Sequence, residues 1–377
     1  MKQKKKEVDV TPWEISEKNV DYDKLVKDFG VTTISKELTK EFDKQKLHPL
    51  LRRGIYFAHR DFDKWLLAKK QNKKVSIITG RGPSEKMHIG HLIPFFIAKS
   101  LQDKFNCEVF IPISDDEKFF VKENLNFENA LKYSEDNILD LIALGFDAKK
   151  TFIFQDFKYT NIYTYAAQIA KRITYSTSKA VFGLKPENNV GWSFYPAMQA
   201  AHILFPQFYT KEKHISLVPV AIDQDPFIRL TRDIAQHKDF NLEKPAAIHA
   251  KFMPALNGSA KMSSSDSENN LIYLSDTAKE VETKIKKYAF SGGQETIEQH
   301  RKLGGDVETD VSFQYLKMFF EPDDKKLAKI EKDYKSGKLL SGELKQILIE
   351  KVNSFLEQHQ KAKQKAKKDL DKFLIKN

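Results

Sequence analysis

Two short segments that lie far apart in the chain carry side chains suited to phosphate chemistry. The first is GRGPSEKMHIGH at 80–91, in which His88 and His91 are three positions apart and would share one face of a first helical turn. Their imidazoles could donate hydrogen bonds to triphosphate oxygens, since free groups at a helix start favour anions. Arg81 adds a fixed positive charge, and Gly90 leaves room for a flat purine. Taken alone, the tetrapeptide at 88–91 is more simply a loop with two surface histidines.

The second segment is Lys261-Met262-Ser263-Ser264-Ser265, within the small, polar stretch NGSAKMSSSDS. Loops of this composition are often mobile and close over substrates. One lysine and three hydroxyl groups suit a pyrophosphate leaving group. Alone, this segment is more simply a flexible serine linker. Together the two segments predict a single ATP site, because their order fits and about one catalytic domain separates them.

The elements around these segments predict a sheet that brings them together. Strands and helices alternate from 75 to about 260, which predicts a doubly wound, Rossmann-like parallel sheet with helices on both faces. In such sheets ligands bind where the strands end, and the first segment directly follows a strand. The predicted strands are 75–79, 108–114, 151–156 and one that runs into a polar loop at 214–225; the predicted helices are one that begins near His88, and 128–146, 161–183 and 194–205.

The chain divides into four predicted parts. Residues 1–20 are predicted to be a flexible basic tail and the start of an N-terminal extension, and 21–74 the helical part of that extension. Residues 75–270 are predicted to be the α/β catalytic domain and 271–377 an all-helical domain. The last stretch, QKAKQKAKKDLDKF, predicts a lysine-rich helix with a solvated face, and a contact with nucleic acid is the alternative.

Composition narrows the class of protein. The 377 residues are 41% hydrophobic and carry a net charge of +11, which suits a polyanionic partner or simply a lysine-rich surface. Cys107 is the only cysteine, so neither an internal disulfide nor a cysteine metal cluster is possible. The basic start lacks an apolar stretch and the run LIPFFIA is too short to span a bilayer, so we expect a cytoplasmic protein without a membrane partner.

The whole sequence resembles the class I aminoacyl-tRNA synthetases, whose HIGH and KMSKS motifs match 88–91 and 261–265. Within them it is most similar to the tryptophanyl-tRNA synthetases of the eukaryotic and archaeal type, from about Pro12 nearly to the C-terminus. The shared stretches include TGRGPS, MHIGHLIPF, DDEK, KTFIF, FYPAMQAA, AIDQDPF, KMSSSD and AFSGGQETIEQHRKLGG.

This resemblance implies an activity and its partners. The family joins L-tryptophan and ATP to form tryptophanyl-adenylate and pyrophosphate, and then charges tRNA-Trp. It implies Mg²⁺ bound with the ATP and not by protein ligands, a homodimer, and a helical domain that reads the anticodon.

The resemblance also assigns roles to individual residues. His88, His91 and Lys261 would be catalytic, stabilising the charge that grows on the phosphates. The residues expected to bind ATP are Gly80, Arg81, Gly82, His88, Gly90, His91, Ala221, Lys261, Met262 and Ser263. The residues expected to bind tryptophan are Gly80, Glu117, Gln199 and Gln224.

Three positions depart from the family pattern. Ile78 stands where the family usually has a tyrosine that faces the indole, and Pro112 where it usually has Gln or Glu. Either another group, such as Gln199, bonds the indole N–H, or recognition of the indole is altered, because a buried unpaired N–H costs about 1–3 kcal/mol. The second motif reads KMSSS, so one lysine of KMSKS is missing.

Three other functions remain as alternatives. A tyrosine enzyme shares the fold, but Ile78 and Pro112 supply no polar group for a phenol. A non-catalytic paralogue would have no need of His88, His91, Lys261 and Gln224. A small adenylyltransferase shares an H-x-G-H turn, but the 261–265 loop and the helical domain speak against it.

Overall fold

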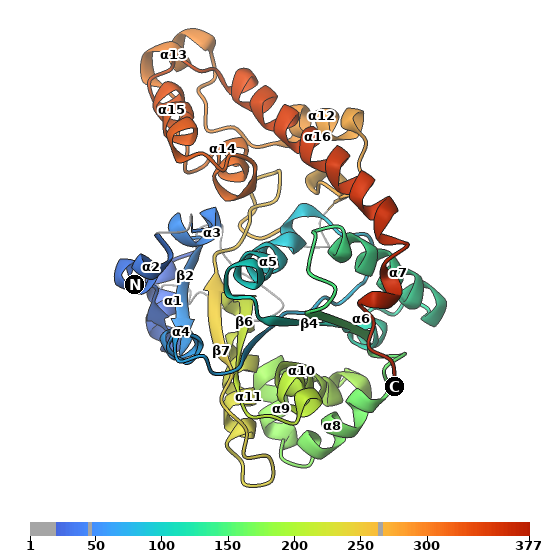
Figure 1. Ribbon diagram of the computed structural model, residues 1–377. Helices are drawn as coiled ribbons and strands as arrows, with labels where there is room; N and C mark the ends of the chain where they lie inside the picture. Colours follow the sequence, from blue (N-terminus) through green and yellow to red (C-terminus); the bar gives the residue numbers. More distant parts are fainter. Residues whose placement is uncertain (1–19, 44–46, 263–266) are drawn as a thin grey trace, which may run out of the picture.

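The computed structural model describes residues 20–43, 47–262 and 267–377. Its centre is a seven-stranded sheet with the strand order β1-β2-β7-β6-β3-β4-β5 (Figure 1). Strands β7, β6, β3, β4 and β5 run parallel, and β3 lies between β6 and β4. This order puts a switch point between β3 and β6, and it confirms the predicted α/β fold. The parallel strands are β3 (Val75–Ile78), β4 (Glu108–Ile113), β5 (Thr151–Gln155), β6 (Ile215–Ala221) and β7 (Ala246–Ala250).

Both faces of the parallel sheet are covered, which explains why its strands are almost continuously apolar. Ile77 faces one core with α5 (Ile93–Phe105), while Ile78 faces a second core with α10 (Val190–Thr210) and α11 (Asp225–Ala235). Figure 1 shows α5 on one side of the sheet and α8 (Asn161–Ala170), α10 and α11 on the other.

The N-terminal extension contains strands as well as helices, so the prediction of an entirely helical segment at 21–74 is wrong for 56–60. These residues form β2 (Tyr56–Arg60), which pairs antiparallel with β7 and with the short β1 (Thr32–Thr33). The helix α4 begins only at Phe62, after Asp61 turns the chain with φ 53°. The strand depends on a partner almost two hundred residues away, and local apolar spacing does not reveal it. The helices of this extension are α1 (Tyr22–Phe29), α2 (Lys36–Asp43), α3 (Pro49–Arg52) and α4 (Phe62–Lys70).

The predicted helix at 161–183 is two helices in the structure. The first, α8, ends at Ala170, and α9 (Tyr175–Phe182) begins after Thr174. The Thr174 hydroxyl accepts a hydrogen bond from the Thr177 N–H at 3.1 Å, which caps the new helix. Two further helices follow β4, namely α6 (Asp115–Val121) and α7 (Phe127–Ile142).

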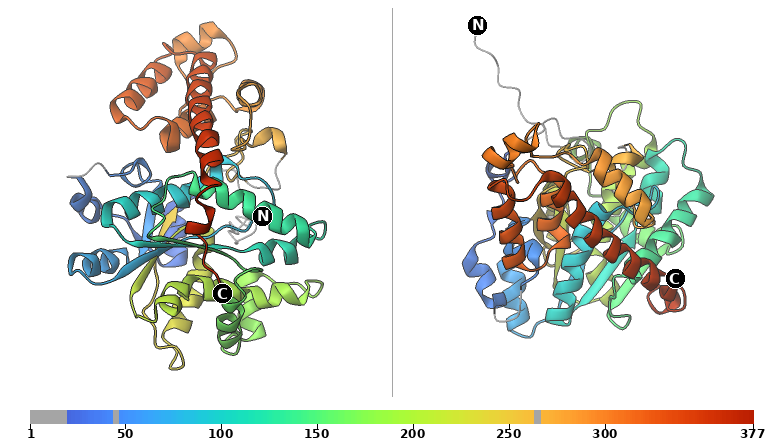
Figure 2. Two further views of the ribbon diagram at one scale, coloured as in Figure 1. Left: turned by 45° about the vertical axis from the view of Figure 1, so that its right-hand side comes forward. Right: turned by 90° about the horizontal axis from the view of Figure 1, so that it is seen from above.

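The described chain from Ala278 to Ala366 is helical, as predicted for this region. Figures 1 and 2 show these helices on one side of the sheet layer, with the long α16 running back toward the edge of the sheet. None of the described helices is long and apolar enough to cross a membrane. They are α12 (Ala278–Tyr288), α13 (Ile297–Leu303), α14 (Val311–Tyr315), α15 (Asp324–Lys335) and α16 (Ser341–Ala366), with a π-helical turn at Leu316–Phe320.

One face of α16 is bonded to the catalytic region, so the expectation of a solvated lysine-rich helix is only partly right. His359 Nε2 lies 2.9 Å from Asp140 Oδ1 on α7, and Lys363 Nζ lies 2.9 Å from Asp140 Oδ2 and 2.8 Å from Asp136 Oδ1. Lys363 is therefore held in an internal ion pair, whereas Lys365 and Lys367 are exposed.

Beyond α16 the chain returns to the sheet. The Ile153 N–H on β5 donates to the Phe373 carbonyl, and the Ile375 N–H donates to the Ile153 carbonyl, both at 2.8 Å. The segment 373–375, which follows the helical region, thus pairs with the outer edge of β5.

Candidate active site

A cavity of about 500 Å³ opens where β3 and β6 end. It contains the switch point of the sheet, where doubly wound folds bind ligands. The structure brings every described residue of the predicted site to its wall, and Ser263 lies outside the described residues. These residues are Gly80, Arg81, Gly82, His88, Gly90, His91, Glu117, Gln199, Ala221, Gln224, Lys261 and Met262.

The loop after β3 passes so close to β4 that its glycines cannot be larger. The Arg81 N–H donates to the Pro112 carbonyl at 3.0 Å, and the Ser114 N–H donates to the Arg81 carbonyl at 2.9 Å. A Cβ on Gly80 would lie 2.9 Å from the Pro112 oxygen, and one on Gly82 would collide with the Glu117 carboxylate. The two glycines therefore let the backbone run along the floor of the cavity.

The first motif forms a 3₁₀ turn, Ile89–Leu92, and not yet an α-helix. His91 lies within this turn and His88 is its N-cap. Their rings stack with centroids 3.4 Å apart, and the His88 N–H donates to His91 Nδ1 at 3.2 Å. Burial and the nearby Arg81 lower the pKa of His88 to about 3, and burial lowers the pKa of His91 well below its usual value. His88 is thus a buried, neutral histidine, which makes the interpretation as a surface loop wrong.

The two motifs touch each other. A Cβ on Gly90 would lie 2.9 Å from Met262 Sδ, so Met262 packs directly on the glycine of the first motif. After the second motif the chain pairs with the first again: the Ile89 N–H donates to the Ile272 carbonyl at 3.0 Å, and the Leu274 N–H donates to the Met87 carbonyl at 2.9 Å. The two motifs, each a weak signal by itself, therefore contact each other in the structure, as predicted for a single site.

Lys261 is held at the mouth of the cavity by a residue that the sequence did not single out. Its Nζ lies 2.7 Å from Asp223 Oδ2 and 5.4 Å from the centre of the Phe252 ring. Asp223 lies in the turn after β6, between Ala221 and Gln224, and its Oδ1 is buried without a hydrogen-bond partner. Its place in the AIDQ turn, between two predicted site residues, was the available signal.

Several buried nitrogen atoms of Arg81 and His88 have no hydrogen-bond partner among the described residues. They are Nε and one terminal nitrogen of Arg81, and both ring nitrogens of His88. Buried polar groups are almost always paired in native proteins, so each exception needs an explanation. Burial lowers the pKa of Arg81 to about 10, which leaves it positively charged near neutral pH. This arrangement calls for an anionic ligand with several oxygen atoms.

The opposite side of the cavity is already hydrogen-bonded within the protein. The Tyr195 hydroxyl on α10 lies 3.1 Å from Glu117 Oε2 and 2.9 Å from Gln199 Oε1. Glu117 Oε1 also pairs with Lys118 Nζ at 2.5 Å. Tyr195 was not predicted, although its spacing of four from Gln199 places both on one helix face.

One more polar residue of α10, His202, reaches the same cavity. Its Nε2 lies 2.9 Å from Asp156 Oδ1, at the end of β5. We refer to Arg81, His88, His91 and Lys261 as the loop side of the cavity. Glu117, Tyr195, Gln199 and His202 form the helix side.

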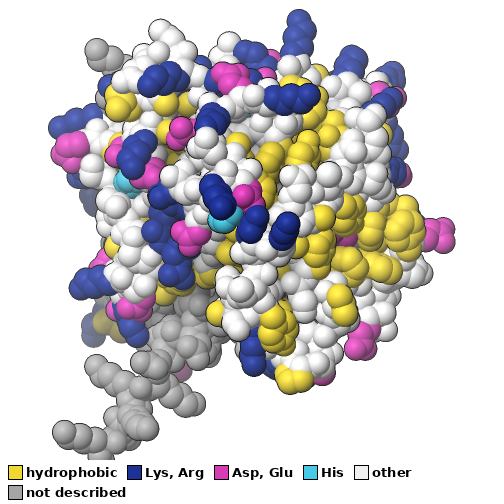
Figure 3. Space-filling model, turned by 90° about the horizontal axis from the view of Figure 1, so that it is seen from below, with side chains coloured by type: hydrophobic (Ala, Val, Ile, Leu, Met, Phe, Trp, Pro, Cys, Tyr) yellow, Lys and Arg dark blue, Asp and Glu magenta, His cyan; other side chains and the backbone are white. Residues whose placement is uncertain are grey.

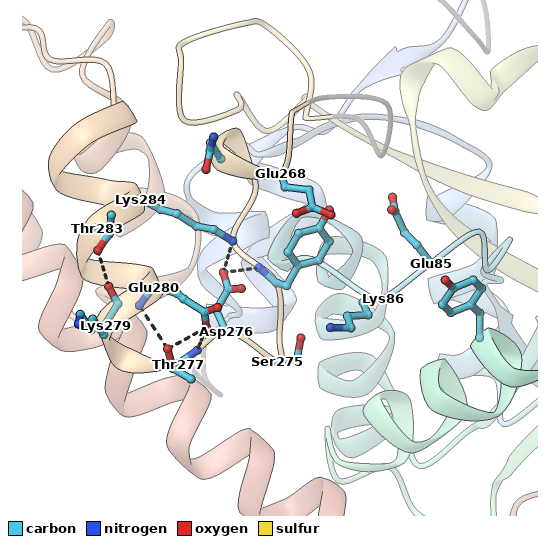
Figure 4. A pocket seen from close by; sticks show the side chains of 13 residues that line it. Glu85, Lys86, Glu268, Ser275, Asp276, Thr277, Lys279, Glu280, Thr283 and Lys284 are labelled. Atoms are coloured by element: carbon cyan, nitrogen blue, oxygen red, sulfur yellow. Dashed lines mark hydrogen bonds and ion pairs between the residues drawn. The ribbon is translucent and has the colours of Figure 1, made fainter. Parts of the chain in front are cut away.

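A second hollow, of about 640 Å³, lies beside the first motif and the start of α12 (Figure 4). Its charged side chains are of both signs, and Lys284 Nζ lies 2.7 Å from Asp276 Oδ2, which also accepts the Tyr273 N–H at 3.0 Å. Tyr273 also forms an isolated antiparallel β-bridge with His88. The charges of this hollow are largely balanced, and none of the predicted site residues lines it.

Comparison with known proteins agrees with this geometry. Residues 69–357 match the family described as tRNA synthetases class I (W and Y). The chain is 52% identical over 369 residues to a tryptophan–tRNA ligase of Sulfurisphaera tokodaii, covering 97% of this chain and 94% of the relative. It is 47% identical over 368 residues to that of Pyrococcus abyssi, covering 97% and 93%.

Solved structures show the same similarity in three dimensions. Tryptophanyl-tRNA synthetase from Giardia lamblia superimposes with a TM-score of 0.86 at 36% identity, covering 94% of this chain and 96% of that one. The enzyme from Aeropyrum pernix superimposes with a TM-score of 0.85 at 34% identity, covering 95% and 97%.

Proposed function

Because the chain belongs to the class I tRNA synthetases for tryptophan and tyrosine, we propose a role for each side of its cavity in charging tRNA-Trp with tryptophan. The protein is an aminoacyl-tRNA ligase of the tryptophan type. It uses ATP to convert L-tryptophan to tryptophanyl-adenylate, with release of pyrophosphate, and then transfers tryptophan to the tRNA.

The loop side binds the triphosphate in this proposal. The carrying observation is the set of buried, unpaired nitrogens on Arg81 and His88. Phosphate oxygens would accept hydrogen bonds from the Arg81 N–H groups and from the one protonated ring nitrogen of His88. His88 is neutral at physiological pH, so it acts as a hydrogen-bond donor and leaves the charge to Arg81 and Lys261. Gly90 lets Met262 and the His88 ring lie close to the backbone, since a Cβ there would lie 2.9 Å from Met262 Sδ.

The chemistry is an in-line displacement at phosphorus. The tryptophan carboxylate is already ionised, so it attacks the α-phosphate without a general base, and the bond to pyrophosphate breaks. Negative charge moves onto the leaving group. Lys261 is tied to Asp223 at 2.7 Å, and it would exchange this partner for pyrophosphate oxygens as the bond breaks. His88 and His91 support the same oxygens.

The helix side holds the amino acid. Glu117 would accept hydrogen bonds from the α-ammonium group, and Tyr195 fixes the orientation of the carboxylate. Gln199 lies in the same hydrogen-bond chain, and Gln224 approaches from the end of β6. These bonds exist before the ligand arrives, so little reorganisation is needed.

Magnesium fits this cavity as an ion carried by ATP. The loop side offers N–H donors and a lysine, a donor set that binds phosphate oxygens and does not itself bind a cation. The ion would therefore be held by the triphosphate, where it neutralises part of the charge.

The homodimer is a further part of the proposal. Phe119 and Phe127 are 36% and 50% exposed and pack with Phe157 at ring distances of 5.7 and 4.7 Å. We propose that this cluster lies at the dimer interface, since exposed apolar patches are typical of contact surfaces. Figure 3 shows, on the face seen from below, apolar side chains gathered from the centre to the right of the view, with basic and acidic side chains around them. Sedimentation of wild type and F127E tests the dimer: a wild-type monomer at micromolar concentration would remove it.

The helical region after 270 is proposed to read the anticodon, with exposed lysines on tRNA phosphates. Charging of tRNA with altered anticodon bases, compared with pyrophosphate exchange on the same enzyme, tests this. Equal charging of all anticodon variants would contradict it.

The decisive test of the function is ATP–pyrophosphate exchange with each of the twenty amino acids. We expect exchange with tryptophan to exceed all others. Exchange with none of them would contradict the enzyme assignment, and exchange with tyrosine above tryptophan would contradict the substrate.

A further inference from the structure

The amino-acid end of the cavity is mostly apolar where a side chain would enter it. Ile78, Pro112, Ile203, Val218 and Phe227 are among the residues that line the cavity. Polar side chains of α10 line the same cavity. An indole ring is apolar except for its N–H, which has to find an acceptor when buried.

His202 is placed to be that acceptor. Tyr195, Gln199 and His202 follow one another at spacings of four and three, so they share the face of α10 that lines the cavity. Tyr195 and Gln199 are engaged with each other and with Glu117. His202 is engaged on one side only, through Nε2 and Asp156 Oδ1 at 2.9 Å.

We infer that Nδ1 of His202 accepts the hydrogen bond of the tryptophan indole N–H and so selects this side chain. The inference rests on the proposed function and names its specificity-determining residue. It also explains how the pocket can take tryptophan although Ile78 and Pro112 offer no side-chain acceptor.

The surroundings of Asp156 fix which nitrogen of His202 carries the proton. Asp116 and Asp156 are both buried, and burial raises the pKa of each well above its usual value. The hydrogen bond between them raises the pKa of Asp116 further and opposes the rise for Asp156, so Asp116 is the carboxyl that keeps a proton. Two carboxylates this close share one proton, so one negative charge remains. Burial lowers the pKa of His202 to about 4, so the ring is neutral. A neutral ring that donates Nε2–H to this charge has its lone pair on Nδ1.

A chain of bonds then holds the ring in place. The Tyr163 hydroxyl on α8 donates to Asp116 Oδ2 at 3.2 Å. Asp116 is paired with Asp156, and Asp156 Oδ1 is bonded to His202 Nε2, so the ring is fixed through these contacts. The acceptor is thus preoriented before tryptophan enters.

The first test needs only the wild-type protein and an analogue. In β-(benzothiophen-3-yl)alanine a sulfur atom replaces the indole N–H at nearly constant shape. In ATP–pyrophosphate exchange, kcat/KM for tryptophan should exceed that for the analogue by about tenfold to a hundredfold, because the analogue leaves Nδ1 unpaired. A ratio below about threefold would show that no group accepts the N–H and would overturn the inference.

Two substitutions separate the acceptor from a merely structural role. H202N keeps an amide oxygen near the Nδ1 position but is too short for Asp156. H202Q reaches Asp156 but leaves nothing at Nδ1. We expect H202N to preserve most of the discrimination against the analogue and H202Q to reduce it to about threefold or less, with little change in KM for ATP. The reverse order would mean that His202 acts only through Asp156, and it would overturn the inference.

A measurement on the wild type covers the case in which both variants fold poorly. In protein labelled with ¹⁵N-histidine, the Nδ1 resonance of His202 should be that of an unprotonated nitrogen and should shift on binding tryptophan but not the analogue. A protonated Nδ1 would overturn the inference. If the wild type shows no tryptophan-dependent exchange at all, the proposed function fails as well, which is a different result from a lost discrimination.

Discussion

On the loop side of the cavity, nitrogen atoms of Arg81 and His88 are buried without partners, whereas on the helix side Glu117, Tyr195 and Gln199 are bonded to one another. The loop side also depends on Lys261, which has an alternative partner in Asp223. The helix side is built on two rigid elements, α10 and the start of α6.

This difference teaches how one cavity can serve two ligands. The donor groups of the loop side have no partner until an anion binds. The hydrogen bonds that they then form can stabilise the charge that develops on the phosphates in the transition state. On the helix side the polar side chains are held by bonds within the protein beforehand, and His202 Nδ1 is left to the ligand, so this side selects a ligand by shape and by a few fixed polar atoms. Substitutions on the loop side should therefore change rate, and those on the helix side should change the affinity for tryptophan.

The largest effect is expected for K261A. Loss of a cation that stabilises the leaving group should lower kcat of ATP–pyrophosphate exchange by about 10²–10³-fold while leaving KM for tryptophan within about twofold. K64A is the matched control, because Lys64 is an exposed lysine paired only with Asp61. An increase in KM for tryptophan as large as the loss of kcat would remove the distinction between the two sides.

The next effect is expected for E117Q on the helix side. Losing the charge that faces the α-ammonium should raise KM for tryptophan by about 10–100-fold, with KM for ATP almost unchanged. E128Q, at the exposed start of α7, is the control. If kcat falls while both KM values stay constant, Glu117 belongs functionally with the loop side.

The two sides share one property, a buried neutral histidine. The folded-state pKa is about 3 for His88 and about 4 for His202, both below that of the unfolded chain. Below about pH 6.5 each histidine is protonated in the unfolded chain, but in the folded protein it stays neutral until the pH nears its lower pKa. Each histidine therefore makes the protein less stable as pH falls through this range. Each contributes a slope of about 1.4 kcal/mol per pH unit to the free energy of unfolding.

Urea unfolding at pH 5, 5.5 and 6 measures this slope. H88N should reduce it by about the contribution of one histidine, because asparagine does not titrate. Asp115 has the opposite effect. Burial raises its pKa to about 6, so the folded state binds more protons than the unfolded state, and its contribution to the free energy of unfolding is lost as pH rises through 6. An unchanged slope in H88N would mean that His88 is accessible to protons in the folded protein.

The smallest effect is expected far from the cavity. K365A/K367A should raise KM for tRNA about threefold to tenfold and reduce the salt dependence of tRNA binding, with pyrophosphate exchange unchanged. Lys363 is left out of this variant because its pairs with Asp136 and Asp140 make it structural. K363A is the contrast: it should lower the unfolding temperature at constant KM for tRNA. Unchanged tRNA charging by K365A/K367A at physiological salt would contradict the contact.

The sequence was sufficient for four of the five parallel strands, because continuous apolar runs are local signals, but it did not reveal β7. The cavity residues were indicated by the two motifs and by the family resemblance. It was insufficient where a partner lies far along the chain. β2 looked helical because its pairing with β7 is not visible locally. Asp223, Tyr195 and the bonded state of Lys363 were missed for the same reason, since each is defined by what it contacts. The burial of His88, which also forms a β-bridge with Tyr273, is a property of the folded chain that no spacing rule contains.

The segment at 373–375 that bonds to Ile153 has a consequence for the order of folding. An unpaired edge strand is a template for pairing with another chain, and here the edge of β5 is covered only after the whole helical region has been synthesised. A newly made chain would therefore display this edge until late in translation. Closing it joins two segments of very large sequence separation, which is a slow step for any chain. Aggregation during expression should be governed by these few residues more than by the larger cores, and a fusion that keeps them from docking should promote it.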